Sequence, residues 1–222
     1  MLAGDTQKAD RLLDLLRFDF REKRIEPEQA IPQLRRVVSA YKSELVDEYT
    51  SNTTALSYAD LLKASQSMPE SIYLQVVDEV TRISIGCELI LMNLRYKTPY
   101  VFQVGINGQV DQVRNFCAIG SGATNAESWL HYRAQSPYLP LATSVVSVYE
   151  AKKFAEHAPG VSKETKLMIM GPYDRVRFLQ SFSTLDGMWS TYGPQTHKRS
   201  QLVGALKAED YMDTKWENVI AD

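Results

Sequence analysis

The sequence predicts a mixed α/β fold of the α+β kind, with helices and antiparallel strands in separate stretches of the chain. Apolar residues recur at helical spacing through the first 50 residues. After Gly86 the spacing changes to that of strands, and three short apolar segments follow one another. Two further helical patterns and another strand pattern come next, so both kinds of element occupy the second half of the chain.

Length and charge limit the classes of function. A chain of 222 residues can bury a sizeable core, and we expect one domain over residues 1–222. The 25 basic and 27 acidic side chains are interspersed and give a formal net charge of −2. This balance provides no electrostatic reason to expect nucleic acid or an anionic membrane as a partner.

The chain carries no pattern typical of membrane or secreted proteins. Its longest apolar run, residues 83–94, is shorter than the roughly 20 residues of a membrane-spanning helix. Asp5 and Lys8 lie where the apolar part of a secretory signal would be. We therefore expect a cytoplasmic protein in which Cys87 and Cys117 are buried, reduced thiols.

Two amphipathic helices are expected at the start of the chain. The first covers residues 5–24, where Asp5 can accept hydrogen bonds from the free amides of the first turn. The second begins at Pro27, because proline is tolerated at the first helical position, and should end near Tyr49. Residues 50–54 are polar and are expected to form a loop.

Weaker helices and then strands are expected in the middle of the chain. In order, these are helices over residues 58–64 and 71–82, and strands over residues 87–94, 100–106 and 115–119. Asn107 and Gly108 supply the positive φ angles of a tight hairpin turn. We therefore expect an antiparallel hairpin within residues 100–122 that leads into a second tight turn.

Two Ser/Thr-x-x-Glu patterns indicate helix starts in the second half. Thr124 with Glu127, and Ser147 with Glu150, fit a capping box. Inner-side positions are expected at Trp129, Leu130 and Tyr132 in the first helix, and at Val148, Ala151, Phe154, Ala155 and Ala158 in the second. Strands should follow over residues 166–170 and 175–182. Residues 173–222 are expected to form a C-terminal extension, whose sequence pattern does not define its structure.

No metal or cofactor site is predicted. The three histidines, His131, His157 and His197, are far apart, and none shares a helix face with a second His or Cys at ligand spacing. Cys117 and His157 could form a thiol and base pair, as in enzymes that use a cysteine nucleophile. The alternative, which we favour, is that Cys117 is a small hydrophobe within a strand.

Residues 120–122, which we call the Gly-Ser-Gly turn, lie between a strand candidate and a helix. This is the position of a phosphate-binding loop, but the third glycine of the dinucleotide fingerprint and the lysine of a P-loop are absent. The alternative is that the glycines allow a tight turn that a side chain would obstruct. There is also no Gly-x-Ser-x-Gly elbow to anchor a serine triad.

The Gly-Ser-Gly turn, with residues 116–119 before it, resembles an internal signature of proteasome β-type subunits, which are N-terminal-nucleophile (Ntn) hydrolases. Residues 2–10 resemble the point in that family where a central strand ends and the first long helix begins. The similarity continues in order through residues 100–110 and 148–170. It implies a four-layer αββα sandwich of two antiparallel sheets between helical layers.

The resemblance also implies that the catalytic nucleophile of the family is missing from this chain. In this family a threonine, serine or cysteine freed at the mature N-terminus attacks the amide, with its own α-amine as base. The first residues here correspond to a point after the strands that carry this nucleophile, so we expect an N-terminally incomplete domain. Thr6 is no substitute because it lies at a helix start. Only Ser121 matches an accessory hydroxyl, and residues 50–85 exceed the family pattern as a helical insertion.

The function implied is that of a proteasome-like, threonine-type peptidase subunit acting on peptides, with this chain inactive for want of a nucleophile. The alternatives are a non-catalytic structural or assembly subunit of a ring-like complex, and an unrelated α/β enzyme. An incomplete sheet leaves an unpaired edge, so we expect a homo-oligomer or complementing subunits. Ile31, Leu34 and Val38 are expected to remain available for this packing.

Overall fold

The computed structural model describes residues 2–22, 27–93, 100–171, 175–179, 181–193 and 211–215. It has a mixed α/β architecture with two antiparallel sheets, as the sequence predicts. The chain divides into two compact units, which we describe separately. Unit 1 contains Met1–Leu91 and Phe102–Gln112, and unit 2 contains Met92–Val101 and Val113–Asp222.

The four-stranded sheet has the order β1-β2-β3-β4. Its strands are β1 (Leu2–Gly4), β2 (Cys87–Asn93), β3 (Tyr100–Val104) and β4 (Val110–Val113). β1 and β2 are antiparallel, with Leu2 opposite Leu89 and Gly4 opposite Cys87. The expected strands over residues 87–94 and 100–106 are thus confirmed, apart from their ends.

The β3–β4 hairpin is confirmed, with a different turn from the one expected. The Gly108 amide donates to the Gly105 carbonyl at 2.8 Å, and the Gly105 amide donates to the Gln109 carbonyl at 2.9 Å. Gly108 has a φ of +87°, whereas Asn107 is not in the positive-φ region. The glycine therefore forms a bulge after the turn, and only one position needs a positive φ.

The strand expected over residues 115–119 is wrong. β4 begins at Val110 instead, directly after the hairpin turn. The turn at Gly108 reverses the chain, so the residues that follow it immediately pair with β3. Residues 116–119 are irregular, and the Ala118 amide donates to the Glu127 carboxylate at 3.0 Å.

Two long helices belong to unit 1, α1 (Thr6–Glu22) and α2 (Pro27–Thr54). The Asp5 carboxylate accepts from the amides of Gln7 and Lys8 at 3.0 and 3.2 Å, so the expected cap is confirmed. Leu12 of α1 is buried, as are Leu34 and Val38 of α2. The last two are therefore not available for packing between subunits, contrary to expectation.

The loop expected over residues 50–54 is also wrong, because α2 continues through Thr54. Threonine hydroxyls in this last part donate to backbone carbonyls of the preceding turn. The Thr53 hydroxyl bonds Tyr49 at 2.8 Å and the Thr54 hydroxyl bonds Thr50 at 2.7 Å. These polar side chains are satisfied within the helix, which is why their polarity does not indicate its end.

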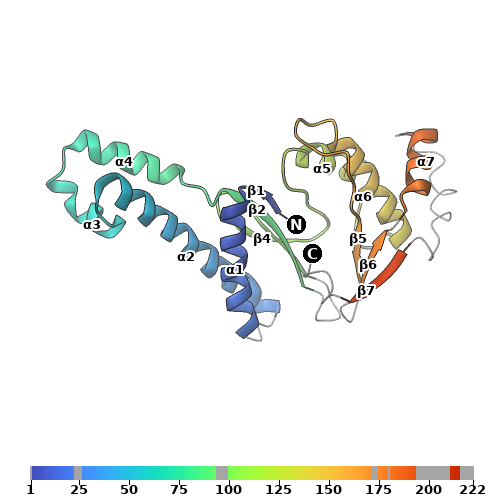
Figure 1. Ribbon diagram of the computed structural model, residues 1–222, viewed down its shortest axis with the longest axis horizontal. Helices are drawn as coiled ribbons and strands as arrows, with labels where there is room; N and C mark the ends of the chain where they lie inside the picture. Colours follow the sequence, from blue (N-terminus) through green and yellow to red (C-terminus); the bar gives the residue numbers. More distant parts are fainter. Residues whose placement is uncertain are drawn as a thin grey trace. The chain divides into compact units, whose positions relative to one another are not determined.

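Beyond α2 lie α3 (Tyr58–Lys63), a 3₁₀ turn (Ala64–Gln66) and α4 (Glu70–Arg82) (Figure 1). The two helices predicted here are thus confirmed. The Ser57 hydroxyl caps α3 by accepting from the Asp60 amide. Leu61, Val76 and Val80 form a small buried core against the second half of α2. We call residues 43–82 the helical arm.

The described residues of unit 2 form a three-stranded sheet and three helices. Its elements are α5 (Ala123–Tyr132), α6 (Leu141–Ala155), β5 (Met168–Met170), β6 (Arg175–Leu179), α7 (Ser183–Tyr192) and β7 (Tyr211–Lys215). The sheet order is β5-β6-β7, with Ile169 opposite Arg177 (Figure 1). The strand expected over residues 166–170 is confirmed in part, and the next ends at Leu179, since α7 begins at Ser183.

Neither expected capping box forms. α5 begins at Ala123 and has no side-chain cap, so Thr124 lies inside the helix. Ser147 lies in the middle of α6, and its hydroxyl donates to the Thr143 carbonyl at 3.0 Å. Val148, expected on the inner side, is exposed. α6 starts directly after Pro140, which needs no amide bond of its own.

Candidate functional site

The Gly-Ser-Gly turn is shaped by the close approach of α6. Gly120 has a φ of +88°, and its carbonyl accepts from the Ala123 amide at 3.0 Å. A Cβ atom at Gly122 would lie 2.7 Å from the Cβ of Ala155 and 3.0 Å from its carbonyl oxygen. Gly122 is therefore required by packing, which supports the tight-turn interpretation over a phosphate-binding loop.

Ser121 is exposed between these two glycines. Its hydroxyl forms no hydrogen bond with any residue that the structure describes. The side chain is thus accessible and makes no hydrogen bond to the described residues. Its accessory role remains a prediction from the resemblance, and Met1 lies outside the described residues.

A buried ionic cluster joins α5 to α6. Arg133 donates to Glu150 at two points, from Nε at 2.8 Å and from Nη2 at 3.0 Å. The indole Nε1 of Trp129 donates to the same carboxylate at 3.2 Å, and the Arg133 guanidinium lies 4.6 Å from the Trp129 ring centroid. Every charge here has a partner, so the cluster is structural.

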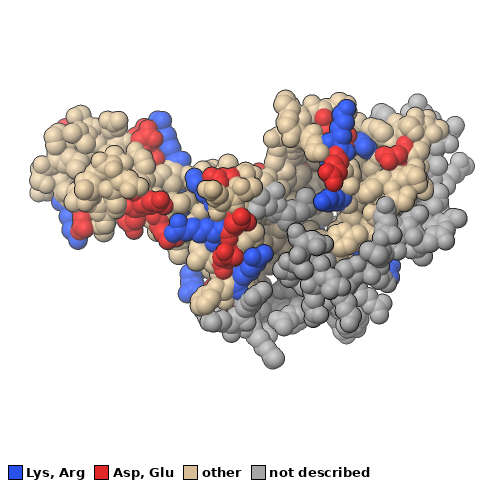
Figure 2. Space-filling view, viewed as in Figure 1, with Lys and Arg blue, Asp and Glu red and all other residues tan. Residues whose placement is uncertain are grey.

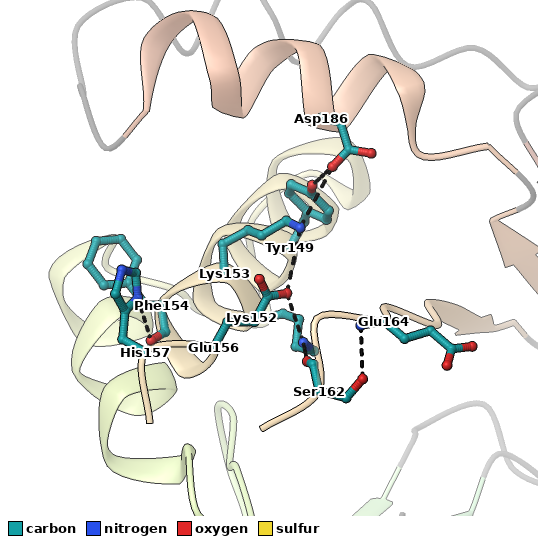
Figure 3. Close-up of polar contacts among 9 residues, drawn as sticks. All are labelled: Tyr149, Lys152, Lys153, Phe154, Glu156, His157, Ser162, Glu164 and Asp186. Carbon is teal, nitrogen blue, oxygen red and sulfur yellow. Dashed lines mark hydrogen bonds and ion pairs between the residues drawn. The ribbon is translucent and has the colours of Figure 1, made fainter. Parts of the chain in front are cut away.

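A second polar network lies where α6 meets α7 and the segment that follows α6 (Figure 3). Lys152 pairs with Glu156 at 2.9 Å and donates to the Ser162 carbonyl. Lys153 lies 3.6 Å from Glu156 and 3.8 Å from Asp186. Each carboxylate of this network therefore faces at least one ammonium group.

Tyr149 completes the network by donating its hydroxyl to Asp186. Burial, followed by this hydrogen bond to a carboxylate, raises the pKa of Tyr149 above its usual value near 10. The phenol therefore stays protonated at neutral pH. It can donate a hydrogen bond, but it is not an activated nucleophile.

The thiol and histidine side chains do not form a catalytic pair. Burial, with a smaller effect of Glu127, raises the pKa of the Cys117 thiol to about 11. A protonated thiol is a poor nucleophile. Its proposed partner His157 has its ring Nδ1 3.2 Å from the carbonyl oxygen of Phe154, so the structure does not bring the two together by a hydrogen bond.

Metal ligation finds no support in the described ranges. They contain no group of three or more His, Cys, Asp or Glu side chains that could hold an ion. The His131 ring packs edge-on against Phe116 at 4.8 Å, and His197 lies outside the described residues. No described helix is long and apolar enough to cross a membrane.

The buried cluster is the feature that the sequence analysis missed. Arg133 and Glu150 are 17 positions apart, and only the packing of α5 on α6 joins them. One signal was present, because Glu150 lies beside Tyr149 and Ala151 in a strongly apolar helix. Comparison with known proteins finds no matching family model, no matching curated protein and no matching solved structure.

Proposed function

We propose that this chain is a non-catalytic structural or assembly subunit with an Ntn-hydrolase-like αββα sandwich. One observation carries the proposal: among the described residues, no serine, threonine or cysteine side chain is hydrogen-bonded to a histidine that could act as its base. The thiol of Cys117 is protonated, the phenol of Tyr149 is held by Asp186, and the buried carboxylate of Glu150 is held by Arg133. The chemically capable groups stabilise the fold instead.

The two antiparallel sheets and their helices support the fold part of this proposal. In unit 1, α1 and α2 lie between β1 and β2 in the sequence, and in unit 2, α5 and α6 precede the second sheet. This order of elements is the one that the resemblance implies, except that residues 116–119 are not the strand expected before the Gly-Ser-Gly turn. The stacking of the two sheets between helical layers is itself proposed.

Exposed apolar side chains support the association of this chain with copies of itself or with complementing subunits. Leu141 and Val148, seven positions apart on α6, are both exposed, as is Phe18 of α1. Two residues seven apart lie on one helix face. Burying such a face gives association a hydrophobic contribution.

The test combines light scattering with a peptidase assay on the full chain. We expect a particle several times the chain mass of 25.2 kDa, and no turnover of fluorogenic peptides. Leu141→Ser with Val148→Ser should lower the particle mass, whereas the surface control Asp78→Asn should not. A stable monomer at micromolar concentration would overturn the assembly proposal.

The second candidate is a proteasome-like peptidase subunit, favoured by the exposed hydroxyl of Ser121 in the Gly-Ser-Gly turn. It predicts hydrolysis of fluorogenic peptides that a covalent inhibitor of N-terminal threonines blocks. Ser121→Ala should then lower the rate without changing the melting temperature. This result would replace the non-catalytic assignment.

A further inference from the structure

The tip of the β3–β4 hairpin contains a covalently weak pair of residues. The chain has six asparagines, and only Asn107 is followed by glycine. Asparagine is a thermolabile residue, because the backbone nitrogen of the next residue can attack the carbon of its side-chain amide. Glycine has no Cβ, so it leaves that nitrogen accessible and the backbone free to rotate. Asn107 is therefore the asparagine at which this attack meets the least steric resistance.

The folded turn holds the nitrogen that would attack. The Gly108 amide donates to the Gly105 carbonyl at 2.8 Å, and the Gly105 amide donates to the Gln109 carbonyl at 2.9 Å. The attack needs the Gly108 nitrogen without its proton and turned toward the Asn107 side chain. A hydrogen bond through that proton opposes both changes. The exposed Asn107 side chain thus lies beside a nitrogen that the turn keeps unreactive.

Helix α2 keeps the turn closed. Lys42 donates to the Asn107 carbonyl at 3.3 Å. Gly108 approaches α2 so closely that a Cβ atom there would lie 3.2 Å from Cγ1 of buried Val38. Opening the turn breaks the hydrogen bond from Lys42 and exposes part of Val38, so it costs free energy that an unfolded chain does not need to supply.

From these contacts we propose that Asn107 is a site of spontaneous deamidation, and that opening of the hairpin turn controls its rate. In the open turn, the Gly108 nitrogen forms a bond to Cγ of Asn107. The Cγ–Nδ2 bond breaks, and ammonia leaves with the proton of the Gly108 amide. Water then opens the cyclic imide: its addition at Cγ gives aspartate, and its addition at the main-chain carbonyl carbon gives isoaspartate. Water is the only other reactant, so the proposal holds whether or not the chain is a subunit of an assembly.

The two products change the hairpin differently. Each places a new carboxylate at position 107, whose carbonyl Lys42 already contacts. Figure 2 shows Lys and Arg among Asp and Glu over α1 and α2, so one further charge does not create a surface of a single sign. Isoaspartate also adds a carbon atom to the main chain within the turn, and the hydrogen bond from Gly108 to Gly105 no longer fits. We expect isoaspartate, but not aspartate, to release the turn from α2.

The test compares the folded and the unfolded full chain at the same mildly alkaline pH. Samples are incubated in buffer and in guanidinium chloride, digested, and mapped by mass spectrometry for conversion of each asparagine to an acid. In guanidinium chloride, Asn107 should convert fastest of the six asparagines. In buffer its rate should be at least ~10-fold lower, because the turn is closed most of the time.

Hydrogen exchange connects this rate to the turn. Exchange of the Gly108 amide also requires that its hydrogen bond open, so its protection factor reports the same opening. This factor should equal the ratio of the two deamidation rates. Asn107→Asp should keep the protection, and the isoaspartate form, separated by chromatography, should lose it.

Two valine variants test the contact with α2. Val38→Ala removes part of the surface on which Gly108 lies, and it should raise the deamidation rate in buffer severalfold. The control is Val148→Ala, which shortens an exposed valine of unit 2 and should leave the rate unchanged. Neither variant should alter the rate in guanidinium chloride. Asn107→Gln should strongly slow the conversion at this position, since its longer side chain must close a larger ring.

Three results would overturn the proposal: no conversion of Asn107 in the unfolded chain, equal rates with and without guanidinium chloride, or equal acceleration in Val38→Ala and Val148→Ala. Conversion in buffer that is faster than Gly108 exchange allows would show that the reaction occurs in the closed turn, and hairpin opening would not control it. If Val38→Ala does not fold, the exchange comparison on the unchanged chain decides the question.

Discussion

Arg133 and Glu150 are joined by two charge-assisted hydrogen bonds, of 2.8 and 3.0 Å, and both residues are buried between α5 and α6. The guanidinium is fixed further by the face of Trp129. A buried charge without its partner costs far more than the intact pair contributes, since neither group can recover its hydration. The pair therefore specifies how these two helices meet.

Replacing one member of this pair should be strongly destabilising. Glu150→Leu leaves a buried, unpaired guanidinium, and we expect a loss of about 3–5 kcal/mol in the free energy of unfolding. Adding Arg133→Met should restore much of this loss, because the remaining charge is removed. Urea unfolding followed by circular dichroism measures both values.

The control for that measurement is Asp78→Asn in the exposed pair of Asp78 and Arg82. Exposed pairs of this kind contribute about 0–1 kcal/mol. If Glu150→Leu costs no more than Asp78→Asn, the buried cluster is not a determinant of stability.

Gly122→Ala should destabilise the protein by about 1–3 kcal/mol, because the new methyl group would meet the backbone and Cβ of Ala155. Gly187→Ala is the matched control. A Cβ atom at Gly187, inside α7, would have no neighbour within 4 Å. It should stabilise by about 0.5–1 kcal/mol, since alanine favours the helix. Equal effects in thermal melts would contradict the role of the turn.

Alkylation of Cys117 should rise with pH well beyond the usual range for a thiol. The reactive species is the thiolate, and burial holds its pKa at about 11. The rate with iodoacetamide should therefore increase roughly tenfold per pH unit through pH ~10. Cys117→Ser should abolish the native-state reaction, as Cys87 is fully buried. A plateau near pH 8.5 would show an ordinary, exposed thiol.

Tyr149 should ionise later than the other tyrosines in an absorbance titration. Its folded-state pKa is raised by burial and by the hydrogen bond to Asp186, so the folded protein keeps this proton above the pH at which the unfolded chain loses it. The stabilising contribution is thus present below pH ~10 and is lost as the pH rises through the folded-state pKa.

Two variants identify the residue responsible for the late titration step. Tyr149→Phe should remove the late step, and Asp186→Asn should move it toward lower pH because the carboxylate no longer holds the proton. An unchanged profile in Tyr149→Phe would assign the late step to another residue.

Local signals predicted local structure well. Asp5 and Pro27 marked the starts of α1 and α2, and Gly108 marked the hairpin. The errors arise where a non-local partner decides. Thr124 looked like a cap, but the chain enters α5 at Gly122, where only a glycine fits against Ala155. The end of α2 is a different case, because the hydroxyl of Thr54 bonds to a carbonyl one turn earlier in the same helix, and its polarity therefore does not mark a loop.

The site was harder to predict than the fold for the same reason. The partners of Arg133 and Tyr149 come from separate helices, at Glu150 and Asp186. Neither pair has a spacing that a sequence pattern could reveal. Ser121 could be located from its glycine neighbours, because a tight turn is a local structure.

α2 connects the hairpin to the helical arm as one uninterrupted rod. Near its middle, Lys42 donates to the Asn107 carbonyl in the hairpin turn, and Arg35 donates to the Val110 carbonyl. The helix of 28 residues is about 42 Å long. Its internal proline, Pro32, precedes both contacts, so the missing amide bond does not create a hinge between hairpin and arm. Two hydrogen bonds tie this single helix to the hairpin, so α2 itself sets the distance between the hairpin turn and the helical arm.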